Sequence, residues 1–408
     1  MRKILNMTLA SILCLLLIPI GSQAASIQYI NQSPEMDSFL HEAARRYSSS
    51  GGGRVGILNT INGSYEDTLT QRKKAQNTPA IFTVTAGDQF EECKNLCLPL
   101  EHTGAGKLLR DDHFALPAGD HAAAIGMNDY VSGILVNKTL LKKAGYEVSD
   151  IRDQKSLIRI SDEIQRNAKR LGVDGAFTTA ALSEDSIWSF SIILTGVPIW
   201  YEMQEMNADR HEILNGYRAL VDLMLRDETT PSGQAQNCNY ETARQEFLNR
   251  RAVFLLTGTW DGAALLNQNF APEELAVIPL YLGVDDADQG LCSGSDLYWC
   301  ISNKVSREKQ QEAEKFLYWL TGTETGVNLC IQNLGVVPYK TCGVSGSVFY
   351  SADEKMMRQG KEEITPISTL IPSAEWKANL DNMLRAYALG NADWSRIEDC
   401  YADFFEKD

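Results

Sequence analysis

The chain has 408 residues, of which 53 are acidic and 38 are basic, and its formal net charge at pH 7 is −15. An acidic surface of this kind argues against binding to nucleic acid or to an anionic membrane. The length exceeds what a single hydrophobic core comfortably supports, so we expect two domains.

The amino terminus has the three-part layout of a secretory signal peptide. Two basic residues and the apolar stretch 12–20 lead to a small-residue cleavage pattern before Ala25. The apolar stretch is too short to span a bilayer, so the sequence predicts removal of residues 1–24 and export to the periplasm or the cell exterior. Cys14 follows a leucine, where a lipoprotein signal has Gly or Ala, so we expect no lipid anchor.

Eight cysteines remain after this cleavage, and an even number in an exported chain predicts disulfide bonds. Metal binding is the alternative. No third cysteine or histidine lies near the C-x-x-x-C pair at ligand spacing, so we expect neither a metal site nor a cofactor. The eight are Cys93, Cys97, Cys238, Cys292, Cys300, Cys330, Cys342 and Cys400.

Strand-like and helix-like segments alternate along the mature chain. Short apolar runs are typical of strands, and between them apolar residues recur every three or four positions, as from Leu157 to Leu171. This alternation predicts an α/β fold with helices packed on mainly parallel sheets. The predicted strands span residues 27–30, 54–58, 80–84 and 133–136, and the predicted helices span 35–47, 138–144, 157–171, 213–224 and 313–320.

Motifs of known enzymes are incomplete in this sequence. His41-Glu42 and His211-Glu212 do not continue to the zinc-binding H-E-x-x-H. Residues 343–346 (GVSG) miss the G-x-S-x-G nucleophile elbow by one residue. Carboxylates are abundant, so a secreted carbohydrate-active enzyme stays open as an alternative, but we expect a protein that is not an enzyme.

Four segments resemble, in the same order, those of one protein family. They are a strand-Asn-Lys-helix segment at 133–145 (GILVNKTLLKKAG), a helix, basic turn, strand and G-x-W loop at 247–260 (FLNRRAVFLLTGTW), a strand and helix at 299–317, and a G-x-x-P turn at 335–338 (GVVP). Together they resemble the maltose-binding-protein-like, carbohydrate-binding branch of ABC-transporter solute-binding proteins.

The resemblance implies a two-lobed periplasmic-binding-protein-like fold in which both lobes are discontinuous. The first lobe comprises residues 25–130 plus 290–343, and the second comprises 131–289 plus 344–408. Hinge crossovers lie near 128–133, 290–295 and 342–347. A small solute, expected to be a mono- or oligosaccharide, binds between the lobes, and the closed form of a monomer docks on permease subunits. A sensor that presents its solute to a receptor kinase is the alternative with the same fold.

Aromatic platforms for sugar rings are the first candidates for the binding site. Trp260 ends the G-x-W loop and is followed by Asp261. Trp376 precedes the last long helices, and Trp188 begins an aromatic helix. For each tryptophan the alternative is a side chain packed in the core.

Polar residues in loops after strands, or at the crossovers, are the second set of candidates, because such loops carry ligands in α/β sheets. They are Asn31, Asp88, Asp129 and Asp296, and a solvated loop is the alternative for each. The family often has an aromatic residue near Thr85, which this chain lacks. We therefore expect a ligand that is different from, or smaller than, a maltodextrin.

The lobe boundaries implied by the resemblance place six cysteines in the first lobe and two in the second. Complete pairing within the lobes is then possible, and a bridge across the cleft would oppose closure. Although the sequence does not fix the connectivity, we expect the pairs 93–97, 292–300, 330–342 and 238–400.

Overall fold

The computed structural model describes residues 27–32, 36–58, 65–74, 77–178, 182–184, 186–204, 209–261, 265, 270–342, 347–365 and 374–405. The predicted signal peptide, residues 1–24, lies outside the described residues. No helix in the described part of the chain is long and apolar enough to cross a membrane.

The first sheet has the strand order β2-β1-β3-β11-β5-β4. β1 pairs in parallel with β2 and β3, whereas β11 pairs antiparallel with β3 and β5. Helices cover both faces, because neighbouring residues of β1 pack into different cores, Tyr29 with α1 and α12 and Ile30 with α2. The strands are β1 (Ile27–Ile30), β2 (Val55–Leu58), β3 (Ile81–Val84), β4 (Ala115–Ala118), β5 (His121–Gly126) and β11 (Tyr298–Ile301), and the helices are α1 (Asp37–Ser49), α2 (Tyr65–Lys74), α3 (Asp88–Cys93), α4 (Gly104–Leu108), α12 (Arg307–Gly322) and α13 (Glu324–Leu334).

The second sheet has the strand order β12-β10-β6-β8-β7, and β9 also pairs with β6. Its larger core contains most of the buried side chains of α6, α8, α9, α15 and α16, and a smaller core lies under α10 and α14. The strands are β6 (Tyr130–Asn137), β7 (Gly175–Phe177), β8 (Ala252–Gly258), β9 (Leu275–Ile278), β10 (Gln289–Gly294) and β12 (Glu362–Ile364), and the helices are α5 (Lys138–Lys143), α6 (Gln154–Arg166), α7 (Ala168–Leu171), α8 (Trp188–Met203), α9 (Arg210–Arg226), α10 (Tyr240–Leu248), α14 (Val348–Arg358), α15 (Ala374–Ala388) and α16 (Ser395–Phe405).

Local sequence explains where α5 begins and ends. The side chain of Asn137 accepts a hydrogen bond from the backbone N–H of Leu140 and so caps the helix directly after β6. Gly145 has a φ of +94°, which L side chains rarely adopt, and it reverses the chain after the helix. Asn137 and Gly145 of the sequence motif therefore have direct structural roles.

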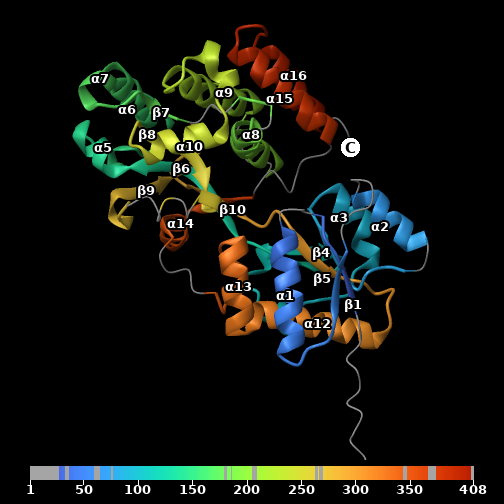
Figure 1. The fold of residues 1–408 in the computed structure, drawn as a ribbon. Coiled ribbons are helices and arrows are strands. Elements are labelled where there is room, and N and C mark those ends of the chain that lie inside the picture. Colours follow the sequence, from blue (N-terminus) through green and yellow to red (C-terminus); the bar gives the residue numbers. More distant parts are fainter. Residues whose placement is uncertain are drawn as a thin grey trace, which may run out of the picture.

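The chain passes three times between the two sheets, so the predicted two-lobed α/β fold is confirmed. The sheets are mixed and not mainly parallel as predicted, because most of their strand pairs are antiparallel. The crossovers are residues 127–129, 295–297 and the segment between α13 and α14, of which 343–346 lie outside the described residues. Figure 1 shows the two lobes one above the other, with β6 to β10 in the upper lobe and β1 to β5 in the lower. The second crossover follows β10, because β10 pairs with β6 through Gly294. This corrects the predicted boundary at residue 290.

The cysteines depart from the predicted disulfide framework. No disulfide bond joins any of the eight in the described part of the chain. Cys292 lies on β10 and Cys300 on β11, so a 292–300 bond would join two different sheets. The buried Cys300 instead interacts with Cys97, and burial raises the pKa of the Cys300 thiol well above its ordinary value. The pairs 93–97, 330–342 and 238–400 stay predictions.

Candidate functional site

Four aromatic side chains from separate segments of the second lobe contact one another. Trp188 and Tyr240 have ring centroids 5.5 Å apart, Trp188 and Trp260 are 6.2 Å apart, and Tyr130 and Trp260 are 6.0 Å apart. We call these four side chains the aromatic wall. Trp188 and Trp260 are each 38% exposed, whereas the other five tryptophans of the chain are less than a tenth exposed. The two exposed indole rings are therefore the two that touch each other.

The aromatic wall lies beside the first crossover. Gly258, at the end of β8, pairs with Ser132 near the start of β6, and Tyr130 is the first residue of β6. A Cβ atom on Gly258 would lie 2.3 Å from the Trp260 ring and 2.7 Å from the carbonyl oxygen of Val131. The glycine of the G-x-W motif is thus required for the ring to pack against β8, and the motif places Trp260 at the lobe junction.

A hydrogen-bond network supports Trp260 from behind. The indole Nε1–H donates to the hydroxyl oxygen of Tyr240 at 2.6 Å, and the Tyr240 hydroxyl donates to Oδ2 of Asp261 at 2.5 Å. Thr257 also donates to Oδ2, at 2.6 Å, and Arg244 lies 3.5 Å from Oδ1. Burial and the nearby carboxylate of Asp261 raise the pKa of Tyr240 well above its ordinary value.

This network corrects the expected role of Asp261. The side chain is only 2% exposed, and its carboxylate already accepts hydrogen bonds from protein groups. Asp261 is therefore a support of the wall and not a ligand contact. No pattern in the sequence pointed to Tyr130 or Tyr240, because an aromatic residue at the start of a strand or helix is common in any core.

Trp376 is a second correction. Its side chain is 3% exposed, its Nε1–H donates to the backbone oxygen of Cys400 at 2.8 Å, and its ring packs edge-on against Phe404. These contacts join α15 to α16 within the large core of the second lobe. No ring face is left for a ligand, so the core alternative is correct for this tryptophan.

The polar candidates of the first lobe lie at one edge of its sheet. Asn31 follows β1, and Asp88 begins α3 a few residues after β3. Tyr298 pairs with Val84, which brings the crossover residue Asp296 to the same edge. The amide of Asn31 is buried and donates to Asp37 at 2.7 Å. These residues and the aromatic wall thus occupy the sheet edges next to the crossovers.

Asp129 connects the crossovers. Its buried carboxylate accepts a hydrogen bond from Arg110 of the first lobe at 2.5 Å. Its backbone N–H donates to Val336 of the third crossover at 2.9 Å, and its carbonyl accepts from the Tyr350 hydroxyl on α14 of the second lobe. Burial raises the pKa of Asp129 to about 6, against the opposing charge of Arg110. Asp129 is therefore a structural residue of the hinge.

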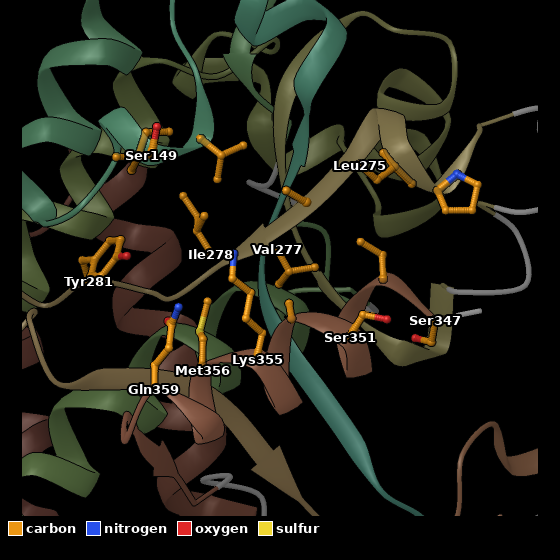
Figure 2. A pocket seen from close by; sticks show the side chains of 16 residues that line it. Ser149, Leu275, Val277, Ile278, Tyr281, Ser347, Ser351, Lys355, Met356 and Gln359 are labelled. Carbon is orange, nitrogen blue, oxygen red and sulfur yellow. The ribbon is translucent and has the colours of Figure 1, made fainter. Parts of the chain in front are cut away.

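A separate pocket of about 490 Å³ lies between α14 and β9 on the second lobe (Figure 2). Lys355 and Met356 of α14 stand across from Ile278 of β9, and Lys355 carries the one charge among the described residues that line the pocket. None of the wall residues lines it. Because only second-lobe segments form this pocket, it differs from a site that two lobes share.

Two sheets joined by three crossovers, with aromatic and polar side chains at the adjoining edges, define a two-lobed ligand-binding protein. The chain belongs to the bacterial extracellular solute-binding proteins, whose family model matches residues 42–358. This confirms the resemblance seen in the sequence, and it means that the protein is exported.

Solved structures share the fold over nearly the whole chain. A family 1 extracellular solute-binding protein from Bifidobacterium longum subsp. infantis is 17% identical, with a TM-score of 0.66, and the match covers 93% of this chain and 99% of that one. The apo form of RafE from Streptococcus pneumoniae is 15% identical, with a TM-score of 0.71 and coverage of 94% and 98%. A sugar transporter protein from Bacillus licheniformis, in complex with stachyose, is 14% identical, with a TM-score of 0.64 and coverage of 93% and 98%. No curated protein matches the sequence.

Proposed function

We propose that the protein captures a saccharide between its lobes and delivers it to the permease subunits of an ABC transporter. The aromatic wall carries this proposal, since it exposes two adjoining indole rings beside the hinge. Sugars offer C–H faces that pack on such rings and hydroxyl groups that bond to polar side chains. Asn31, Asp88 and Asp296, at the adjoining edge of the first sheet, are candidates for the polar contacts.

Structures similar to this chain support a saccharide as the solute. One is RafE in complex with raffinose, another is a chitin oligosaccharide binding protein, and a third holds stachyose. Because their sequence identity to this chain is low, the shared fold does not identify which sugar this chain binds. The proposal therefore extends to saccharides as a class.

A thermal-shift screen of the mature protein tests this proposal. Raffinose, stachyose, chitooligosaccharides, monosaccharides, polyols and amino acids would each be added to the unliganded protein. A saccharide present at 100 times its dissociation constant adds about 2.7 kcal/mol to the free energy of unfolding. Stabilisation by amino acids, with none by any saccharide, would contradict the proposal.

The partner is tested by capture of the sugar-loaded protein. We expect the loaded form to bind permease subunits reconstituted in nanodiscs, and the empty form to bind them more weakly. Selective binding to a receptor-kinase ectodomain would favour the sensor alternative.

The proposal includes no chemical change in the sugar. Asp261 is buried and bonded to protein groups, so it is unavailable as one member of a pair of catalytic carboxylates. The best-bound saccharide should be recovered intact after incubation, as a mass spectrum would show. We also propose that the protein is a monomer without a lipid anchor. The mass of the native particle and the mass of the mature chain, both measured on protein purified from its native host, test these two points.

A further inference from the structure

The hydroxyl of Tyr240 lies at the centre of the network behind the aromatic wall. It contacts three polar atoms, namely Nε1 of Trp260, Oδ2 of Asp261 and Oγ1 of Thr257, at 2.6, 2.5 and 2.7 Å. A hydroxyl has one proton to donate and two lone pairs that accept. These contacts leave it little capacity for a ligand.

The ring of Tyr240 packs against Trp188, the second exposed tryptophan. Its centroid lies 5.5 Å from that of Trp188, with an interplanar angle of 38°. The same side chain therefore touches Trp260 through its hydroxyl and Trp188 through its ring. Trp188 and Trp260 come from segments more than 70 residues apart in the sequence, and Tyr240 joins them behind their direct contact.

A buried charge strengthens this arrangement. The carboxylate of Asp261 is bonded to the Tyr240 hydroxyl and lies 3.5 Å from the guanidinium of Arg244. Hydrogen bonds to an ionised group are stronger than neutral ones, and bonds in a chain polarise one another. The carboxylate therefore makes the Tyr240 oxygen a better acceptor for the indole N–H of Trp260.

We infer that Tyr240 is the positioning residue of the aromatic wall. Tyr240 fixes the orientation of Trp260 and Trp188 before a ligand arrives, and it does not bond to the ligand itself. Its effect on ligand affinity rests on the proposed function. Its effect on Trp260 in the unliganded protein does not.

Tyr240→Phe tests the inference, because it removes the hydroxyl and keeps the ring. In the unliganded protein, the indole N–H resonance of Trp260, assigned by its loss in Trp260→Phe, should move upfield. Its hydrogen exchange should become about tenfold faster, as expected when one hydrogen bond is lost. For any saccharide that binds the wild type in the screen, affinity should fall about tenfold.

Tyr387→Phe is the matched control. The Tyr387 hydroxyl donates to Asp222 at 2.5 Å, so this variant also removes a tyrosine–carboxylate hydrogen bond from the second lobe, away from the wall. It should leave the Trp260 resonance and the affinity unchanged. Asp261→Asn is a second variant in case Tyr240→Phe folds poorly, and it should change the Trp260 resonance in the same direction by a smaller amount.

Each outcome has a distinct meaning. An unchanged Trp260 signal in both Tyr240→Phe and Asp261→Asn would overturn the inference. So would a loss of affinity without any change at Trp260, because Tyr240 would then contact the ligand directly. If no saccharide binds the wild type, the proposed function fails, while the measurement on the unliganded protein still decides the role of Tyr240.

Discussion

Trp260→Ala is the perturbation that most directly tests the aromatic wall. A tryptophan side chain has an accessible area of up to about 250 Å². Since 38% of Trp260 is exposed, about 95 Å² is available for a ligand to cover. At about 25 cal/mol per Å², full coverage is worth about 2.4 kcal/mol. We therefore expect an affinity loss of up to about sixtyfold, or about 2.4 kcal/mol.

Isothermal titration of the best saccharide from the screen measures this loss, and chemical unfolding of the unliganded protein measures the accompanying change in stability. Tyr318→Ala is the control, because Tyr318 is an exposed aromatic residue on α12, in the first lobe, with 46% of its surface exposed. Its replacement should leave affinity unchanged. Wild-type affinity in the folded fraction of Trp260→Ala would refute the reasoning and make Trp260 structural.

Four further measurements test other features of the fold and the site. Trp376→Ala should lower the free energy of unfolding by about 3–5 kcal/mol and leave the ligand affinity of the folded protein unchanged, as urea unfolding and titration would show. Weaker ligand binding by this variant would mean that Trp376 contacts the ligand after all. Gly258→Ala should displace the neighbouring indole ring and weaken saccharide binding, so an unchanged affinity would contradict the close packing. Burial and nearby carboxylates raise the pKa of Asp353, on α14, to about 8. The folded state therefore binds a proton that the unfolded state has lost, and the free energy of unfolding should fall as pH rises from about 4 to about 8. Asp353→Asn should flatten that fall in unfolding curves measured across this pH range, and an unaltered slope would refute the assignment. In a peptide map of protein oxidised with glutathione disulfide, no fragment should join Cys292 to Cys300, because the two residues lie on different sheets, and such a bond would contradict the strand assignment.

The sequence predicted the features that depend on local patterns. The three- and four-residue spacing of apolar side chains identified α6 and α7, although the predicted single helix is divided at Asn167. The G-x-W pattern located Trp260 through its resemblance to the solute-binding family. Both signals lie within a few residues of the element that they predict.

Features that depend on distant packing could not be read in this way. Trp376 and Trp260 are both tryptophans near the start of a predicted helix, and only the docking of α16 buries the first of them. The strand β10 has the sequence QGLCSG, whose small and polar residues are typical of a loop, and its pairing with β6 makes it a strand. Tyr240 acquires its role from contacts with Trp188, Asp261 and Trp260, none of which lies on α10.

The position of the aromatic wall beside the first crossover bears on the order of events during capture. In a rigid-body rotation, the displacement of a group grows with its distance from the axis, so residues next to the crossovers move least. Tyr130 directly follows Asp129, and Gly258 pairs with Ser132, so the wall lies close to any axis through these segments. A ligand can therefore dock on an almost stationary wall while the lobes are apart. Rotation then adds the contacts of the first lobe, and the wall's contribution to affinity is already present in the open form.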